Sequence, residues 1–247
     1  MRRTPIRVAI KNELVSSGWY LKRVRNVPTG ISWAWDYKRL LPNTVTQTLI
    51  DIGANIGQTT KFMRREFPHA TIHAFEPIPD AFSILKDRTS SMCHVILHNT
   101  AISDSDGIMT IKYLGTSQQN SLDSSRLDSN PSAKQAMISL ATLDAVCSKH
   151  RISMIDVLKT DTEGHDTHVL RGAKSLLSSG AIKVVVTEVT FDRMDRLHTS
   201  FSDIDEILLP AGFLLCGLYE TETLQRNPAG GTYCNAMFVQ RKLLPKT

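Results

Sequence analysis

Four carboxylates stand within or at the end of apolar runs in this chain, at positions where they could do chemistry together. Asp51 lies in TLIDIG, Glu76 in HAFEP, Asp161 in VLKTD and Glu188 in VVVTEV. Each run has the composition of a buried strand of a parallel sheet, and the carboxyl ends of such strands meet at one edge. A row of carboxylates at that edge can bind a nucleoside cofactor and act on a substrate beside it.

The turn after the first run has the pattern Gly53-x-Asn55-x-Gly57. Glycine permits a sharp turn and close approach of a ligand, and Asn tolerates the left-handed conformation. Glu76 follows Gly57 by 19 residues, the place of a carboxylate that accepts ribose hydroxyls. Asp51 beside the turn would repel the phosphates of a dinucleotide and attract the ammonium of S-adenosylmethionine. The pattern therefore favours S-adenosyl-L-methionine over NAD.

A second group follows the fourth predicted strand, in the segment KTDTEGH. Asp161, Glu163 and His165 alternate, so in an extended chain they would face one side, next to Glu188 on the neighbouring strand. Such a group could serve as a general base or hold a hard divalent cation through its oxygens, although a metal is not part of the prediction. We expect Lys159 to pair with a site carboxylate rather than to act as a catalyst.

Structural roles compete with the catalytic ones at several of these positions. Glu163 could equally cap the helix that follows, because the first turn of a helix favours acids. His165 could be an exposed residue at the helix start, and Glu188 could hold a loop by hydrogen bonds. Asn120 and Ser121, in a polar loop, are candidates for contact with a second substrate. His168 is assigned to the surface, and the remaining histidines, including His73 and His94, are interpreted as structural.

The elements that must position these residues alternate between strand and helix from Thr46 onward, which predicts a parallel sheet with helices on both faces. The last two strands have no helix between them, so we expect a hairpin and one antiparallel strand. The expected strands are 48–53, 70–77, 95–103, 154–161, 181–189, 213–219 and 235–242, with an extra edge strand at 107–114. Helices are expected at 58–67, from Pro79, before the fourth strand, from Asp166 to near Gly180, and from Ser202. Residues 115–135 are predicted to form a long loop.

The composition fits one large α/β domain, and no apolar run approaches the roughly 18 residues that span a bilayer. The net charge is +5, but residues 1–40 carry nine Lys or Arg against two acids. We therefore divide the chain into a basic, aromatic N-terminal extension, residues 1–45, that packs on the core, and a cofactor-binding domain, residues 46–247. The extension could contact an anionic substrate, a membrane surface or nucleic acid, or could be only a solvated face. The four cysteines form no CxxC pair, and no secretory signal is evident, so a cytoplasmic protein is expected.

The motifs DIGANIGQ, AFEP, LKTDTEGHDTHVLRGA and NAMFV together resemble the FkbM-type S-adenosylmethionine-dependent methyltransferases, over roughly Thr46 to Val239. The resemblance implies the class I methyltransferase fold, a seven-stranded Rossmann-like sheet with an antiparallel last strand. It places Asn99–Ile102 beside the adenine and the motif after the fourth strand at the transferred methyl. The expected cofactor-binding residues are Asp51, Gly53, Ala54, Asn55, Gly57, Gln58, Glu76, Pro77, Ala101 and Asp161. The catalytic candidates are Asp161, Glu163, His165 and Glu188.

The function that follows is O-methylation of a hydroxyl on a sugar, a glycolipid or oligosaccharide, or another natural product. Two alternatives remain: a nucleic-acid methyltransferase that uses the basic extension, and a nucleoside-binding protein without catalysis. The first lacks the N/D-P-P-Y/F/W tetrapeptide expected for methylation of base amino groups, and no RNA-binding module is recognisable. The row of strand-end carboxylates argues against the second. The oligomeric state is left open.

Overall fold

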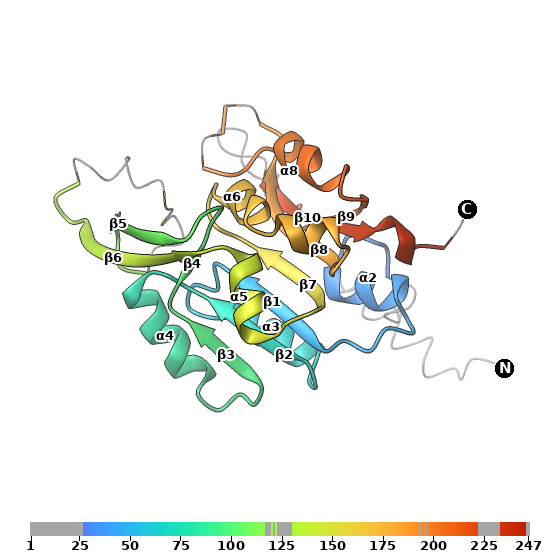
Figure 1. Ribbon diagram of the computed structural model, residues 1–247, viewed down its shortest axis with the longest axis horizontal. Coiled ribbons are helices and arrows are strands. Elements are labelled where there is room, and N and C mark those ends of the chain that lie inside the picture. Colours follow the sequence, from blue (N-terminus) through green and yellow to red (C-terminus); the bar gives the residue numbers. More distant parts are fainter. Residues whose placement is uncertain are drawn as a thin grey trace, which may run out of the picture.

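The computed structural model describes residues 27–116, 120, 122, 130–192, 194–195, 197–221 and 233–245. Ser121, a candidate for contact with a second substrate, lies outside these ranges, as do residues 1–26 of the N-terminal extension. A large sheet with helices on both faces forms the body of the molecule, and a smaller sheet projects from one side (Figure 1). Within the described residues, no helix has the length and apolar character needed to cross a bilayer.

The large sheet has seven strands in the order β3-β2-β1-β7-β8-β10-β9. Six of them run parallel, and β10 is antiparallel to both of its neighbours. This confirms the predicted seven-stranded sheet and its antiparallel last strand. The strands are β1 (Thr48–Ile52), β2 (Thr71–Phe75), β3 (Val95–His98), β7 (Ile155–Thr160), β8 (Ile182–Thr190), β9 (Phe213–Tyr219) and β10 (Tyr233–Gln240).

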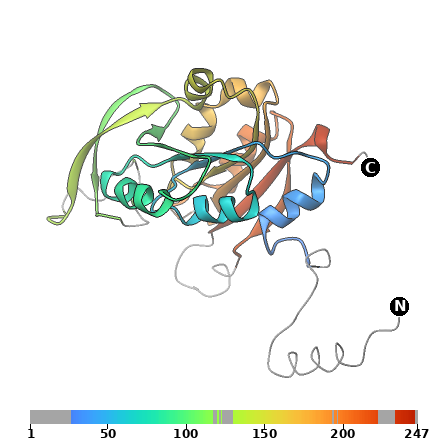
Figure 2. The ribbon, with the colours of Figure 1, turned by 90° about the horizontal axis from the view of Figure 1, so that it is seen from below.

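The helices form two layers, one on each face of this sheet (Figure 2). Side chains alternate along the strands, so Leu49 packs with one layer and Ile50 with the other. One layer holds α2 (Trp33–Leu40), α3 (Gln58–Glu66) and α4 (Pro79–Thr89). The other holds α5 (Leu143–His150), α6 (Asp166–Arg171), α7 (Lys174–Ser178) and α8 (Phe201–Leu208). A 3-10 helix, η3 (Arg241–Leu243), follows β10.

Helix α2 belongs to the hydrophobic core. Trp33 and Tyr37 are almost fully buried and contact Phe67, which follows α3. Asp36 on the same helix is buried as well and accepts hydrogen bonds from the Tyr219 hydroxyl of β9 and from the backbone of Gly30. The described part of the N-terminal extension is therefore tied to the sheet by apolar and polar contacts.

The small sheet corrects the prediction for residues 95–114. The run 95–103 is two strands: β3 in the large sheet and β4 (Ala101–Ile102), which pairs with β6 (Lys134–Ala141). The predicted edge strand is β5 (Gly107–Tyr113), and it pairs with β6 instead of the large sheet. We did not predict β6. These strands pack one face on their own apolar cluster of Ile78, Ala101, Ile111, Tyr113 and Ile138, which explains the alternation read from the sequence.

The single helix predicted from Asp166 is interrupted. It forms α6 and α7, which are separated by Gly172 and Ala173. A Cβ at Gly172 would lie only 1.9 Å from the backbone oxygen of Ser103. The chain after β4 passes close to Gly172, at the break between the two helices. This places Ser103 near the start of α6.

Candidate active site

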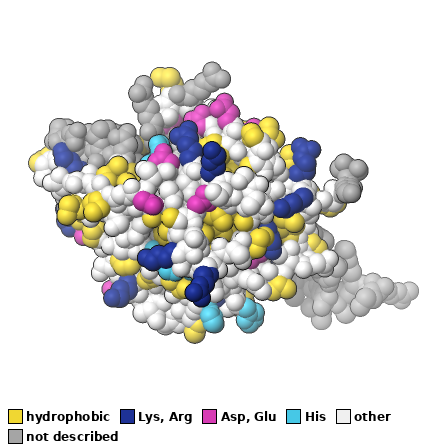
Figure 3. Space-filling model, in the orientation of Figure 1, with side chains coloured by type: hydrophobic (Ala, Val, Ile, Leu, Met, Phe, Trp, Pro, Cys, Tyr) yellow, Lys and Arg dark blue, Asp and Glu magenta, His cyan; other side chains and the backbone are white. Residues whose placement is uncertain are grey.

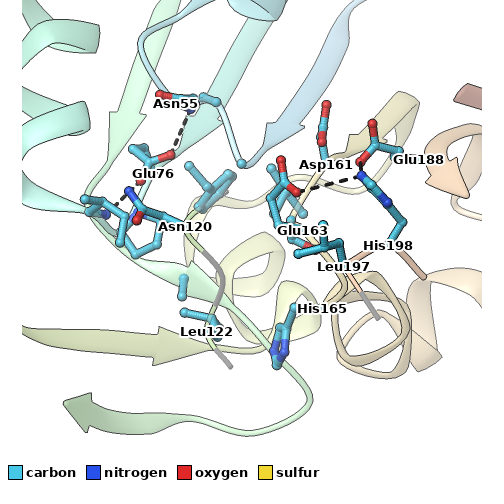
Figure 4. Close-up of a pocket in the computed structure, with 18 of the residues that line it drawn as sticks. Asn55, Glu76, Asn120, Leu122, Asp161, Glu163, His165, Glu188, Leu197 and His198 are labelled. Atoms are coloured by element: carbon cyan, nitrogen blue, oxygen red, sulfur yellow. Dashed lines mark hydrogen bonds and ion pairs between the residues drawn. The ribbon is translucent and has the colours of Figure 1, made fainter. Parts of the chain in front are cut away.

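A cavity of about 980 Å³ opens at the carboxyl ends of β1, β2, β7 and β8. This is the edge where an open parallel sheet binds ligands. Eleven of the thirteen predicted site residues line this cavity. They are Gly53, Ala54, Asn55, Gln58, Glu76, Pro77, Ala101, Asp161, Glu163, His165 and Glu188. Figure 4 shows Asn55 and Glu76 at one end, Glu188 and His198 at the other, and Asp161 and Glu163 between them.

The turn after β1 is held by backbone hydrogen bonds to the end of β2. The amides of Gly53 and Ala54 both donate to the Phe75 carbonyl, at 3.0 and 2.9 Å. Gly53, Asn55 and Gly57 have φ values of 79°, 47° and 91°, so Asn55 does adopt the left-handed conformation expected of it. A Cβ on Gly53 would lie 1.9 Å from the Asp161 carbonyl oxygen. Only glycine permits this contact between the turn and the end of β7.

Glu76 presents its carboxylate to the same end of the cavity. Its two oxygens accept hydrogen bonds from the backbone amides of Asn55 and Ile78, each at 2.8 Å. Burial raises the pKa of Glu76 to about 7, although the two backbone donors favour its ionised form. Asn99 donates to the backbone oxygens of Glu76 and Pro77 and so fixes the chain that follows β2.

Asp51 and Gly57 lie outside the set of cavity-lining residues. The Asp51 carboxylate is buried beneath the turn and accepts a 2.6 Å hydrogen bond from the Thr60 hydroxyl of α3. Burial raises its pKa to about 6. Gly57 is the N-cap of α3, and a Cβ there would lie 2.9 Å from a methyl carbon of Leu85. Both residues therefore connect the turn to α3 and do not line the cavity.

Lys159 and Asp161 form a pair at the centre of the site. The Lys159 ammonium, which is buried inside β7, donates to Asp161 at 3.1 Å and to the Thr160 carbonyl at 3.0 Å. The expectation that Lys159 pairs with a site carboxylate is confirmed. Burial alone would lower the pKa of Lys159, but Asp161 and Glu188 outweigh burial and raise it, so Lys159 stays charged.

The segment from Asp161 to His165 is not extended, and the assumption that its three polar residues share one face of a strand is wrong. β7 ends at Thr160, and Glu163 and Gly164 have φ values of 52° and 93°. The turn nevertheless leaves all three residues lining the cavity. His165 lies at its edge, with Nε2 3.0 Å from the Ser103 hydroxyl and its ring stacked on His168. Burial lowers the pKa of His165 to about 4, so the ring is neutral.

His198 is the principal cavity residue that the sequence analysis missed, because it was grouped with the structural histidines. Its Nδ1 lies 2.7 Å from Asp195, and its Nε2 lies 3.7 Å from Glu188 and 4.0 Å from Glu163. Tyr233, at the start of β10, stacks on the imidazole with ring centroids 4.1 Å apart. The one sequence signal was the spacing of Asp195 and His198 in a polar segment after a strand.

Carboxylates dominate the charge of the cavity. Beyond Glu76, Asp161, Glu163 and Glu188, it is lined by Asp192, Asp195 and Glu220, and no Lys or Arg is among its described lining residues. Burial and the nearby Asp161 raise the pKa of Glu188 well above its usual range. The excess of carboxylates over basic side chains along the described lining suits a cationic ligand. The buried side-chain oxygen of Asn55, which has no hydrogen-bond partner among the described residues, offers a further acceptor at the end of the cavity that holds Glu76.

The glycine turn after β1, the carboxylate after β2 and the acidic cavity at the carboxyl ends of a seven-stranded sheet are features of an S-adenosylmethionine-dependent methyltransferase of class I. The chain belongs to the family described as the methyltransferase FkbM domain, whose sequence profile matches residues 51–215. The predicted family, fold and cofactor are thereby confirmed.

Individual relatives agree with this assignment. A protein of Beauveria bassiana named methyltransferase 1 is 27% identical over 146 residues, which cover 50% of this chain and 57% of that protein. The 31-O-demethyl-FK506 methyltransferase FkbM of Streptomyces tacrolimicus is 26% identical over 209 residues, which cover 73% and 75% of the two chains. The match thus spans little more than half of the fungal relative and three quarters of the bacterial one.

The fold is also found in a solved structure of distant sequence. The fibrillarin pre-rRNA processing protein of Methanococcus jannaschii has a TM-score of 0.50 at 12% identity, over 80% of this chain and 68% of that one. At this identity the likeness concerns the fold alone.

Proposed function

We propose that the protein is an O-methyltransferase that transfers the methyl group of S-adenosylmethionine to a hydroxyl of a sugar, a glycolipid or oligosaccharide, or another natural product. The observation that carries the proposal is the group of Glu163, Glu188 and His198, across the cavity from Glu76. An alcohol must lose its proton as it accepts a methyl group, so it needs groups that stabilise or receive that proton. This end of the cavity supplies them.

The cofactor end holds the donor in one orientation. Glu76 would accept hydrogen bonds from the ribose hydroxyls, and the turn at Gly53 and Asn55 would let the backbone approach the methionine part of the cofactor. When bound, the cofactor supplies a methyl group on a positively charged sulfur. Asp161 is held by Lys159 at the centre of the cavity, where its charge and position help to align donor and acceptor. Most of the acceleration of a methyl transfer can come from such alignment.

The acceptor end combines acids with apolar surface. Met194 and Leu197 line it, and Met194 is 78% exposed. Apolar side chains around a polar centre suit an acceptor that carries a hydroxyl on a carbon framework. The name of the Streptomyces relative, a 31-O-demethyl-FK506 methyltransferase, describes an oxygen acceptor on such a compound and supports the same class for this chain.

The nucleic-acid alternative depends on the basic extension, of which residues 1–26 lie outside the described ranges. On the face shown in Figure 3, the Lys and Arg side chains of the described residues are scattered among hydrophobic and uncharged ones and form no single patch. The acidic lining described above also opposes a phosphate backbone, because binding of nucleic acid relies on Lys and Arg at the phosphates. A neutral acceptor agrees better with both observations.

An acceptor screen with methyl-labelled S-adenosylmethionine tests the proposal. The panel should hold neutral oligosaccharides, glycolipids and hydroxylated natural products, with RNA and DNA alongside. We expect label in a hydroxylated compound, as a methyl ether identified by NMR. Asp161→Ala should lower turnover about 100-fold, whereas Glu206→Gln, on the exposed side of α8, should not. Label in nucleic acid alone, or on nitrogen, would reject the proposal.

A further inference from the structure

We propose that Glu163, Glu188 and His198 bind a divalent transition-metal cation at the acceptor end of the cavity. The site itself follows from the geometry of the three side chains. Its role, to hold the acceptor hydroxyl, rests on the proposed function. The three residues come from different places: the turn after β7, the strand β8 and the segment between β8 and α8.

The ligand atoms converge around a gap of the right size. One oxygen of each carboxylate and one ring nitrogen of His198 lie within 4.8 Å of one another. The distances of 3.7 and 4.0 Å from Nε2 to Glu188 and Glu163 exceed a hydrogen bond, so the imidazole bonds directly to neither carboxylate. Atoms about 2.1 Å from a shared ion lie roughly 3.0 to 3.5 Å apart. A shift of about 1 Å or less at each side chain would therefore bring these atoms to the separations of a metal site, and Figure 4 shows the Glu163 and Glu188 carboxylates on either side of the His198 ring nitrogen.

The imidazole is oriented in the way that metal-binding histidines are. Its Nδ1 lies 2.7 Å from the Asp195 carboxylate, and this contact makes Nδ1 the protonated nitrogen and leaves the Nε2 lone pair facing the two glutamates. Asp195 is fixed in turn by the backbone amides of Leu197 and His198. The His198 side chain is 9% exposed, and the Tyr233 ring covers its face. A carboxylate that accepts the Nδ1 proton in this way fixes the orientation of the imidazole and raises the basicity of Nε2 as a metal ligand.

Backbone contacts fix the two segments that carry Glu163 and His198. Gly164 has a φ of 93°, and a Cβ there would lie 2.7 Å from the Leu197 carbonyl oxygen. The segments thus touch immediately beside the two ligands. Among the described residues, no other set of three His, Cys, Asp or Glu side chains converges in this way. The neighbouring rings of His73, His98 and His150 do not form such a set.

The donor set indicates the class of ion. Two carboxylate oxygens and one imidazole nitrogen suit Mn²⁺, Fe²⁺ or Zn²⁺, whereas Mg²⁺ prefers oxygen ligands and water. Three protein ligands leave coordination positions open toward the cavity. A hydroxyl there would lose its proton more readily, and the proton passes to water at the cavity mouth. The hydroxyl oxygen then forms its bond to the methyl carbon as the carbon–sulfur bond breaks, with the electron pair left on the sulfur of S-adenosylhomocysteine.

The test uses the full-length protein, freed of metal with EDTA, and Mn²⁺ as the probe. Loss of the free Mn²⁺ signal in electron paramagnetic resonance and calorimetric titration both report binding. We expect one Mn²⁺ per chain. Glu163→Gln, Glu188→Gln and His198→Ala should each weaken binding at least about 30-fold, and Asp195→Asn should weaken it about 10- to 100-fold.

Two controls separate loss of the site from loss of the fold. His69→Ala and Glu206→Gln alter an exposed histidine and an exposed carboxylate, and both variants should bind Mn²⁺ as the wild type does. All four site variants should bind S-adenosylhomocysteine within about threefold of the wild type, because they lie away from Glu76. A site variant that binds S-adenosylhomocysteine but not Mn²⁺ supports the inference.

The outcomes also distinguish the ion from the reaction. If neither Mn²⁺ nor Zn²⁺ binds to the wild type, with or without S-adenosylhomocysteine, the metal site is overturned, and Asp195 and His198 act directly on the proton. If the wild type binds Mn²⁺ but methylates a hydroxyl equally well in EDTA, the role of the ion in the reaction is overturned. Stoichiometric Mn²⁺ binding that the site variants abolish, without any hydroxyl methylation, upholds the site and rejects the proposed function.

Discussion

The two ends of the cavity are built in different ways. At the cofactor end, Gly53, Asn55 and Glu76 lie in the turns directly after β1 and β2, and backbone amides hold each piece. At the acceptor end, Glu163 lies in the turn after β7 and His198 in the longer connection between β8 and α8, and the side chains of Asp195 and Tyr233 hold the His198 imidazole. Backbone hydrogen bonds fix the first end, whereas the position of the His198 ring at the second depends on contacts between side chains. Substitutions should therefore affect the two ends differently.

The largest effect is expected from Gly53→Ala, because Gly53 lies where the turn after β1 meets the end of β7. Its new Cβ would overlap the Asp161 carbonyl, and its φ of 79° is unfavourable for alanine. We expect a loss of about 3 kcal/mol in the free energy of unfolding. Thermal denaturation should show Tm lowered by roughly 6 to 12 °C. Calorimetry should also show weaker binding of S-adenosylhomocysteine.

Gly107→Ala is the matched control for this change. Gly107 begins β5 on the small sheet, and no atom lies within 4 Å of a Cβ built there. Its Tm should equal that of the wild type. If both variants unfold at the wild-type temperature, the turn is not as tightly packed against β7 as described.

The next effect concerns the cofactor end alone. Glu76→Gln places an amide NH₂ against one of the two backbone amides that now donate to the carboxylate. It also weakens the acceptor for the ribose hydroxyls. Affinity for S-adenosylhomocysteine should fall about 100-fold, as the loss of charged hydrogen bonds implies. Binding of Mn²⁺ at the acceptor end should be unchanged, and a parallel loss there would show that the two ends are coupled.

The pH dependence of S-adenosylhomocysteine affinity also tests the role of Glu76. Since burial raises the pKa of Glu76 to about 7, the free protein holds a proton there below pH 7, and binding through the ionised carboxylate must release it. Affinity for S-adenosylhomocysteine should therefore fall as pH falls, by about tenfold between pH 8 and pH 6. Titrations at pH 6, 7 and 8 measure this slope. Glu76→Gln should flatten it, and an equal slope in that variant would assign the proton to another group.

The smallest effect is expected from Tyr233→Leu at the acceptor end. The substitution removes the ring that stacks on His198, an interaction worth about 1 kcal/mol. Turnover should fall about fivefold, while the affinity for S-adenosylhomocysteine stays the same. A fall in cofactor affinity without a fall in turnover would contradict the division of the cavity into two ends.

The same difference explains which parts of the site the sequence could predict. Gly53, Asn55 and Glu76 follow apolar runs that read clearly as strands, so their places follow from local pattern and the rules of parallel sheets. His198 and Tyr233 meet only because β10 lies next to β8, and no local pattern records that contact. Asp51 is a different case. Its position beside the turn could be predicted from the sequence, but the burial of its carboxylate beneath the turn and the hydrogen bond from Thr60 could not.

The fold shows a similar division. The parallel strands of the large sheet and its one antiparallel strand followed from alternating strands and helices with a final hairpin, whereas the spatial order of the strands was not predicted. β6 was missed because it lies next to a polar segment that resembled a loop, and its burial depends on the small cluster around Ile111 and Ile138. The break between α6 and α7 depends on the backbone of Ser103, far from Gly172 in the chain. Tertiary contacts decided each of these features.

The position of β10 also sets an order of assembly on the ribosome. Among the described strands, β10 is synthesised after β8 and β9 yet lies between them. Until residues 233–240 have emerged, β9 has no partner in the sheet and β8 has its partner β7 only. The strands β1, β2, β3, β7 and β8 can already pair at that stage, and the cofactor end needs nothing further. A nascent chain that stops after β9 can therefore form the cofactor end while it still lacks Tyr233. Residues 233–240 therefore complete the acceptor end after the strands of the cofactor end have been synthesised.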